Sequence, residues 1–227
     1  MNRIYRKELK YVISEEVYLQ IHSRLNAVME PDAHCRDGHY TVRSQYYDSL
    51  TDGDLSDNLN GVMEKRKIRV RIYSPDDMAA KLEYKCKAGS DGIKYSLLLT
   101  KEEALMMEQH QYDFLLARKE ELALRLYTKM TEQVYFPKTI VEYDRTAYLY
   151  PVSDVRITFD RNLRGSINPI GIYENNPAYV PLLGAGKGVL EIKYNDFFPS
   201  ALKSLVASID SVAQAYSKYA MSRLMFI

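Results

Sequence analysis

Polar and apolar residues alternate along several short stretches of the chain, and the clearest of these is residues 65–73, KRKIRVRIY. Successive side chains of an extended strand point to opposite sides. Four cations therefore share one face: Lys65, Lys67, Arg69 and Arg71. The other face is apolar apart from Arg66 and carries Ile68, Val70 and Ile72. The β-branched residues also favour a strand over a helix. Because four like charges on one face repel one another unless an anion covers them, this strand predicts an anion-binding surface.

The same alternation predicts further strands at residues 6–13, 41–47, 81–87, 139–148, 154–160 and 189–194. Residues 74–77 are typical of a turn, so we expect 65–73 and 81–87 to form a hairpin. A second turn at residues 89–92 leads to a short strand that carries Lys94.

Apolar residues at helical spacing predict helices between the strands. Ser14 and Thr100 each precede acidic residues, which is typical of a helix start. We expect the first helix to end at residues 29–31, a longer helix over roughly 113–130, and a terminal helix over 200–226. Residues 50–63 and 165–188 are rich in Gly, Asn and Asp or Pro, which indicates loops.

The polar faces of the predicted strands carry many more cations than carboxylates. The cations are Lys10, Lys65, Lys67, Arg69, Arg71, Lys81, Lys85, Lys87, Arg145, Arg156 and Lys193. The carboxylates are Glu8, Glu83, Asp160 and Glu191. Each strand alone is typical of an antiparallel sheet with one face in water. The set as a whole favours an α+β fold in which an antiparallel β-barrel closes around a cationic bore, with helices outside it.

Composition narrows the class of protein. The chain has 227 residues, 46% of them hydrophobic and 27% charged, which predicts a single globular domain over residues 1–227. A net charge of only +1 excludes the generally basic surface of nonspecific nucleic-acid binders. Two cysteines, Cys35 and Cys86, no secretory leader and no apolar run of ~20 residues predict a cytoplasmic protein.

The charged residues suggest phosphate and metal chemistry. Arginine offers forked donors to phosphate oxygens, and lysine offers a point charge. Mg²⁺ in proteins uses one or two carboxylates together with substrate phosphates. We expect a divalent cation at Glu191, with Glu8 and Glu83 as lesser candidates.

Seven short motifs occur in order along the chain: ELKY at 8–11, RVR at 69–71, EYK at 83–85, YDR at 143–145, VRI at 155–157, EIK at 191–193 and SKY at 217–219. The ordered set resembles the VTC domain, the polyphosphate-polymerase branch of the triphosphate tunnel metalloenzymes, over nearly the whole chain. The resemblance implies a β-tunnel with the C-terminal helix at it, and synthesis of polyphosphate from ATP with Mn²⁺ or Mg²⁺.

The charge pattern and the resemblance together assign roles to the cations, and the resemblance alone adds Tyr143, Ser217 and Lys218. Catalysis is assigned to Arg69, Arg71, Lys85, Arg145, Arg156 and Lys218. Phosphate binding is assigned to Lys10, Lys67, Lys94, Tyr143, Lys193 and Ser217. In the wider superfamily an N-terminal Glu-x-Glu-x-Lys motif is found, and here its first carboxylate is replaced by Arg6. This departure disfavours a two-metal hydrolase and favours the polymerase branch.

Three functions remain open from the sequence. The first is an ATP-dependent polyphosphate polymerase. The others are a metal-dependent triphosphatase and a non-catalytic receptor for polyphosphate or inositol phosphates. Nucleic acid ranks last as a partner, because a narrow cationic bore suits a flexible phosphate chain and not a duplex. Delivery of a product across a membrane would require a separate membrane protein as partner.

Overall fold

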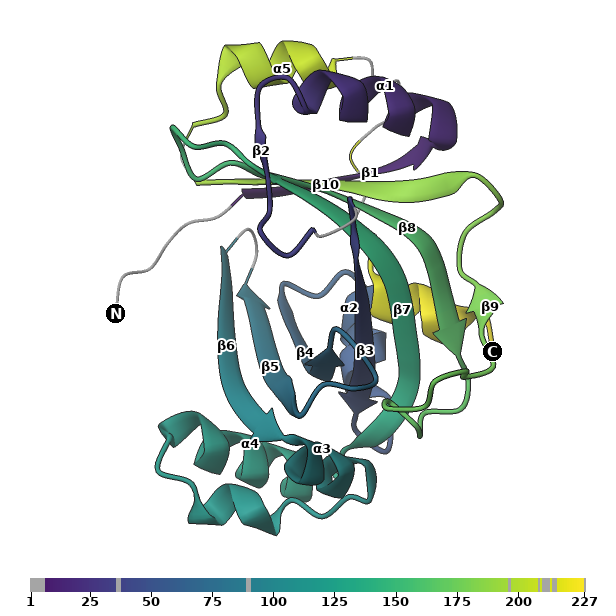
Figure 1. The fold of residues 1–227 in the computed structure, drawn as a ribbon. Coiled ribbons are helices and arrows are strands. Elements are labelled where there is room, and N and C mark those ends of the chain that lie inside the picture. The colour runs from purple at the N-terminus through teal and green to yellow at the C-terminus, as the bar shows by residue number, and fades with distance from the viewer. Residues whose placement is uncertain are drawn as a thin grey trace. The chain divides into compact units, whose positions relative to one another are not determined.

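The computed structural model describes residues 7–35, 38–88, 91–195, 197–207, 209, 213 and 216–226. The fold is mixed α+β and is built on antiparallel strands (Figure 1), which confirms the predicted class. The chain forms two compact units. Unit 1 comprises Met1–Thr41, Glu142–Arg164 and Pro181–Tyr216, and unit 2 comprises Val42–Val141, Gly165–Val180 and Ser217–Ile227. The single domain and the closed channel stay predictions.

The boundaries between the units fall within three strands: β3 (Tyr40–Asp48), β7 (Phe136–Leu149) and β8 (Arg156–Ser166). Unit 1 adds β1 (Lys7–Ser14) and β10 (Lys187–Tyr194), and its strand order is β1-β10-β8-β7. The short β2 (Glu30–Pro31) pairs with the end of β7, and β9 (Val180–Pro181) pairs with β8. The register of unit 1 places Glu191 of β10 between Lys10 of β1 and Thr158 of β8.

The core of unit 1 lies between its strands and two helices. Helix α1 (Glu15–Leu25) and helix α5 (Ser200–Val206) lie together over β1 and β10 (Figure 1). Ile21 of α1 and Leu202 of α5 pack with Ile157 and Leu190 from the strands. Helix α1 begins where expected, because the Ser14 hydroxyl accepts a hydrogen bond from Val17 N at 3.3 Å. With the apolar faces buried there, the charged faces of β1, β8 and β10 point to the other side of the strands.

Unit 2 contains the strand predicted most clearly from the sequence. Its strands are β3, β4 (Glu64–Ile72), β5 (Ala79–Ala88) and β6 (Asp91–Thr100), in that order in the sheet. The predicted hairpin of β4 and β5 is confirmed, with Val70 opposite Leu82 and Arg69 opposite Glu83. The strand that carries Lys94 is ten residues long, not short as expected.

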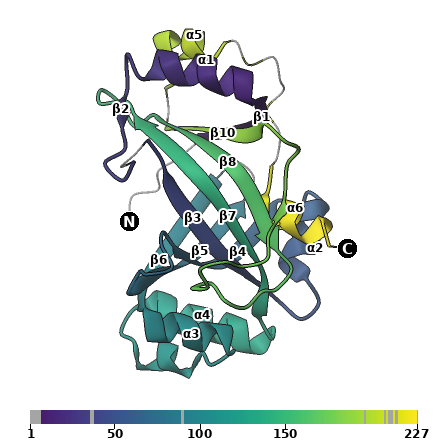
Figure 2. The same ribbon diagram turned by 45° about the vertical axis from the view of Figure 1, so that its right-hand side comes forward.

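Helices cover the apolar face of the unit 2 strands. These helices are α3 (Lys101–Glu108), a 3-10 helix (Asp113–Ala117) and α4 (Glu121–Glu132). Ile68, Val70 and Leu82 of the strands share one core with Leu126 and Met130 of α4. Two further helices, α2 (Gly53–Leu59) and α6 (Lys218–Leu224), belong to the same unit and lie beside each other (Figure 2). The capping box predicted at Thr100 is confirmed, with Glu103 as its second member.

Two of the expected helices are interrupted. The helix expected over 113–130 is divided at Arg118, which is extended and bonds Glu103, Glu120 and the carbonyl oxygen of Leu98. The terminal helix expected over 200–226 is in fact α5 and α6, because Ser217 is extended and its hydroxyl caps a new helix at Ala220 N. Val212, expected on the apolar stripe of that helix, and Arg6 lie outside the described residues.

The polar loop expected over residues 50–63 contains α2. Its cap comes from Asp48 at the end of β3, which accepts hydrogen bonds from Asp54 N and Leu55 N. No helix in the part of the chain that the structure describes has the length and apolarity needed to cross a membrane.

Candidate functional site

The charged face of unit 2 brings like charges into direct opposition. Lys67 of β4 lies opposite Lys85 of β5, and Lys85 lies opposite Lys94 of β6. Arg71 lies opposite Lys81 in the same way. Such pairs destabilise a sheet that has only water over it, so the register itself favours a bound anion.

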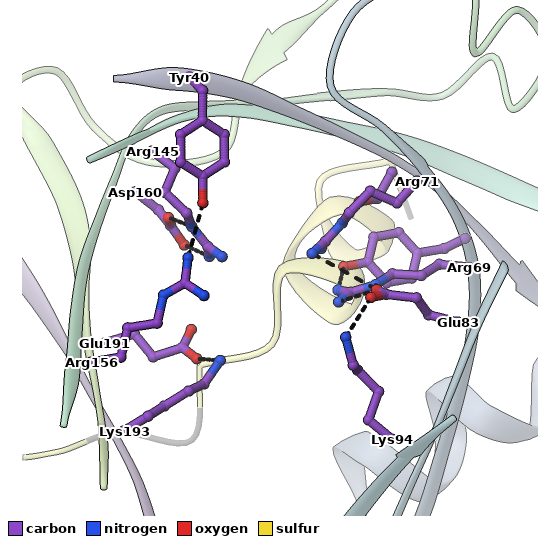
Figure 3. A network of polar contacts seen from close by, with 12 residues as sticks. Tyr40, Arg69, Arg71, Glu83, Lys94, Arg145, Arg156, Asp160, Glu191 and Lys193 are labelled. Carbon is purple, nitrogen blue, oxygen red and sulfur yellow. Dashed lines mark hydrogen bonds and ion pairs between the residues drawn. The ribbon is translucent and has the colours of Figure 1, made fainter. Parts of the chain in front are cut away.

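A buried carboxylate lies at the centre of this face. Glu83 is 2% exposed and accepts bonds from Arg69 Nε and Lys94 Nζ, both at 2.7 Å (Figure 3). Arg71 NH1 lies 3.8 Å from the same carboxylate. Burial alone would raise the pKa of Glu83, but Arg69, Arg71 and Lys94 lower it well below its usual range. Glu83 is therefore ionised, and it holds three cationic side chains in fixed positions.

Further contacts orient these cations from neighbouring elements. Arg69 donates to the Tyr46 hydroxyl at 3.1 Å, and Arg71 donates to the Ser44 hydroxyl at 3.0 Å, both on β3. Lys67 Nζ donates to Ser217 Oγ at 2.8 Å, which places the start of α6 at the charged face of β4. Lys218, the first residue of α6, is half-buried next to it.

The charged face of unit 1 is organised differently, because its cations have carboxylate partners nearby. Arg145 makes two bonds to Asp160, at 2.7 and 2.8 Å, and Asp160 is fully buried (Figure 3). Arg156 donates to Asp32 at 2.7 Å and to the Tyr40 hydroxyl at 3.1 Å.

Two lysines of unit 1 form ion pairs with the candidate metal ligands. Lys10 lies 2.9 Å from Glu8, and Lys193 pairs with Glu191. Burial lowers the pKa of Lys193, and Glu191 and Glu8 partly oppose that shift. Burial would also lower the pKa of Arg145, but Asp160 raises it well above its ordinary value. On the charged face of unit 1, each of the four cations named above is thus paired with a carboxylate of its own. On the charged face of unit 2, the single carboxylate of Glu83 is shared by three cations.

The acidic residues of unit 1 supply the ligand types that a divalent cation takes. Glu191 and Glu8 lie on the neighbouring strands β10 and β1. Thr158, opposite Glu191 on β8, has a buried hydroxyl that finds no hydrogen-bond partner among the described residues. Two carboxylates and a hydroxyl suit Mg²⁺ or Mn²⁺, which keep phosphate and water among their ligands. Among the described residues, no three His, Cys, Asp or Glu side chains come together as a metal-binding group.

Glu83, the third candidate ligand, is in a different situation. Its oxygens accept from Arg69 and Lys94, and Arg71 lies 3.8 Å away, so three cations would repel a metal ion. Glu8 and Glu191 each form an ion pair with one lysine. The geometry favours an ion-pairing role for Glu83 over the metal-binding role expected from the sequence.

The structure places the expected site residues in two groups. Unit 1 holds Glu8, Lys10, Tyr143, Arg145, Arg156, Glu191 and Lys193. Unit 2 holds Lys67, Arg69, Arg71, Glu83, Lys85, Lys94, Ser217 and Lys218. Tyr143 is 2% exposed, and the Arg145 guanidinium lies over its ring, 5.2 Å from the ring centroid. Tyr143 therefore contacts Arg145 through a cation–π interaction.

Several residues that orient the cations were missed by sequence reasoning. They are Asp32, Tyr40, Ser44 and Tyr46. Alternation within residues 41–47 puts Ser44 and Tyr46 on one face, which was the available signal. Asp32 lies in a loop, and no local pattern indicates that it meets Arg156.

Comparisons with known proteins show what the chain is similar to. A solved structure from Bacillus halodurans, described as a candidate adenylate cyclase, has a TM-score of 0.58 at 14% identity, covering 94% of this chain and 96% of that chain. This likeness shows a shared fold. The PH1819 protein of Pyrococcus horikoshii has a TM-score of 0.49 at 14% identity, covering 96% of this chain and 97% of that chain.

A second candidate adenylate cyclase, from Vibrio parahaemolyticus, has a TM-score of 0.47 at 11% identity, covering 92% of this chain and 86% of that chain. No curated protein matches the chain. The sequence model of one family, the VTC domain, matches residues 5–227. The resemblance drawn from the seven motifs is therefore confirmed, and the chain belongs to the VTC domain family.

Proposed function

We propose that this protein is an ATP-dependent polyphosphate polymerase that transfers the γ-phosphate of ATP to a phosphate or polyphosphate chain. The observation that carries the proposal is the register of β4, β5 and β6, in which Lys67, Lys85 and Lys94 lie opposite one another. A phosphate chain bears a charge on every unit, so it relieves the repulsion along this whole row. Membership in the VTC domain family supports the same substrate class.

In this proposal the cations of unit 2 bind the phosphates and stabilise charge as it develops. Arg69 and Arg71 would offer N–H groups to the oxygens of the transferred phosphoryl group, and Glu83 keeps both guanidinium groups in place before substrate arrives. Such preorganised charge is the main source of rate enhancement in phosphoryl transfer. Lys85 and Lys94 would bind the neighbouring phosphates, and Lys218 would approach from α6.

The bond changes require no protein nucleophile. An oxygen of the acceptor phosphate forms a bond to the γ-phosphorus, and the bond from that phosphorus to the β–γ bridging oxygen breaks, which releases ADP. Arg145 and Arg156 of unit 1 would bind phosphate oxygens, with Lys10, Lys193 and Tyr143 beside them. Mg²⁺ or Mn²⁺, when bound by Glu191 and Glu8, would neutralise charge on adjacent phosphates. A cytoplasmic location and a membrane-protein partner that receives the product belong to the same proposal.

The direct test is incubation of the protein with ATP and Mn²⁺, followed by separation of the products on a gel. We expect a ladder of polyphosphate together with ADP. Free phosphate without a ladder would instead indicate a triphosphatase. Binding of tripolyphosphate without turnover, unchanged in Glu191→Gln, would indicate a receptor.

Two substitutions sharpen this test. Arg69→Ala and Arg156→Ala should each lower the rate of chain synthesis by ~10³ or more, the scale of losing an arginine that stabilises the transition state. Lys119→Ala, at an exposed position in unit 2, is the control and should leave the rate unchanged. Near-normal rates in both arginine variants would contradict the assignment.

A further inference from the structure

The start of helix α6 is joined to the charged face of β4 through one hydroxyl. Ser217 Oγ accepts a bond from Lys67 Nζ at 2.8 Å and another from Ala220 N at 3.3 Å. The same side chain thus begins the helix and orients an ammonium group. Any displacement of α6 along its axis would therefore move Ser217, Lys67 and the adjacent Lys218.

A buried carboxylate in unit 2 holds α6 in place. Asp48 is fully buried at the end of β3 and accepts from the backbone amides of Ser49, Asp54 and Leu55 at 2.7 to 2.9 Å. It also accepts from the Ser49 hydroxyl at 3.5 Å and from the Tyr219 hydroxyl of α6 at 2.6 Å. Burial, and after it Asp48, raises the pKa of Tyr219 well above its ordinary value, so the hydroxyl keeps its proton and donates it in this bond.

The ring of Tyr219 also contacts the cation cluster. It stacks on Tyr46, with ring centroids 5.3 Å apart and planes at 24°. The Tyr46 hydroxyl in turn accepts a hydrogen bond from Arg69. Arg69 is the arginine that pairs with Glu83 (Figure 3). At the other end of α6, Arg223 makes two bonds to Asp52, at 2.8 and 3.0 Å.

We propose that Asp48 and Tyr219 are positioning residues for phosphoryl transfer, with Arg223 as a second anchor. They fix the position of α6, and with it the positions of Ser217 and Lys218 next to the charged face of β4. This inference rests on the proposed function, and it adds a determinant of rate that touches neither phosphate nor metal. Because phosphoryl transfer depends on alignment, and because a displacement of about 1 Å can cost about 100-fold in rate, losing one anchor should slow turnover more than it weakens substrate binding.

The test compares two tyrosines that each lose one buried hydroxyl. Tyr219→Phe keeps the ring and its stacking on Tyr46 but removes the bond to Asp48 and the bond that the hydroxyl accepts from Arg223 at 3.3 Å. Tyr112→Phe is the matched control, because Tyr112 is 5% exposed in the same unit and its hydroxyl donates to the Tyr135 carbonyl oxygen at 2.7 Å. We expect a comparable loss of stability in both variants. Only Tyr219→Phe should lower kcat, by about 10- to 100-fold, with KM for ATP nearly unchanged.

Hydrogen exchange supplies a readout that does not depend on turnover. Amides of α6, Ala220 among them, should exchange faster in Tyr219→Phe than in wild type, and at the wild-type rate in Tyr112→Phe. Arg223→Gln, a milder change at a half-buried position, should also speed exchange in α6 and lower kcat. It keeps the inference testable if Tyr219→Phe does not fold.

Failure of the inference and failure of the proposed function give different results. If wild type makes polyphosphate but the Tyr219→Phe and Arg223→Gln variants keep the kcat of the Tyr112→Phe control, the positioning role is wrong. Unchanged exchange in α6 would overturn it as well. If wild type itself makes no polyphosphate, the proposed function fails, and the inference falls with it.

Discussion

Glu83 is the residue on which the cationic face of unit 2 depends. The residue is 2% exposed, and its carboxylate has Arg69, Arg71 and Lys94 as cationic neighbours. Without it, the three cations would lie close together without a buried counter-charge, a situation that costs several kcal/mol. The residue therefore contributes to stability and arranges the donors for a ligand.

Replacement of Glu83 by glutamine should lower the free energy of unfolding by about 3 to 5 kcal/mol, the usual cost of breaking a buried ion pair from one side. Denaturant unfolding measures this change. Added tripolyphosphate should recover part of the loss, because its charge replaces that of the carboxylate. Glu64→Gln, at an exposed position on the same strand, is the control and should change stability little. Equal stability of the two variants would contradict the role of Glu83.

Asp54 provides a prediction about pH. It is 4% exposed, and burial, followed by the nearby Asp48, raises its pKa to about 6. A carboxyl whose pKa is raised on folding adds to the free energy of unfolding while it is protonated in both states, below its unfolded-state pKa of ~4. That contribution is lost as the pH rises through the folded-state pKa of about 6. The shift of about two units corresponds to about 3 kcal/mol.

Asp54→Asn removes this titration and retains an oxygen that accepts from Tyr135. The free energy of unfolding of the variant, minus that of wild type, should therefore grow by up to about 3 kcal/mol between pH 4 and pH 7. Unfolding curves of both proteins across that range measure the difference. A difference that does not change with pH would show that Asp54 does not titrate there.

At the scale of elements, the hairpin of β4 and β5 places like charges directly opposite one another. Lys85 lies between Lys67 and Lys94. Lys85→Gln should therefore weaken tripolyphosphate binding by about tenfold or more, the value of one charged hydrogen bond.

Without ligand, the Lys85→Gln variant should be no less stable than wild type, since like charges opposite one another are unfavourable. Calorimetry gives both quantities, with Lys119→Gln as the control, and unchanged affinity would contradict phosphate contact at Lys85.

Alternation along the sequence was sufficient to predict β4, β5 and their pairing, because both strands have one buried and one charged face. It was insufficient for α2, whose cap is the Asp48 side chain of the preceding strand and not a residue next to the helix. It also missed the new helix start at Ser217, because apolar spacing continues across a residue that is extended in the structure. Caps and breaks that depend on tertiary contacts have no local pattern.

The candidate site divides in the same way. The cations were predicted because charges of one sign recur at every second position. Their partners were not, because the choice of Asp160 for Arg145, or of Asp32 for Arg156, depends on side chains from other segments. Tyr46 and Tyr47 are adjacent in sequence, yet only the strand register shows that Tyr46 faces Arg69.

At the scale of the whole molecule, a net charge of +1 conceals locally sorted charge. Tripolyphosphate at 100 times its Kd should stabilise the folded protein by about 2.7 kcal/mol. For a chain of this size that corresponds to roughly 5 to 10 °C in Tm. Thermal unfolding with and without the ligand measures the shift, and a duplex DNA of equal charge concentration should produce none. A shift with DNA, or none with tripolyphosphate, would contradict a site suited to a phosphate chain.

The opposed lysines of β4 and β5 also affect how the chain folds. While the hairpin closes, Lys67 and Lys85 must approach each other before their surroundings are complete. Dissolved ions screen that approach, so refolding should become faster as ionic strength rises. The same ions compete with a phosphate chain for the finished protein. The same strand register should therefore make added salt speed refolding of the chain and weaken phosphate-chain binding by the folded protein.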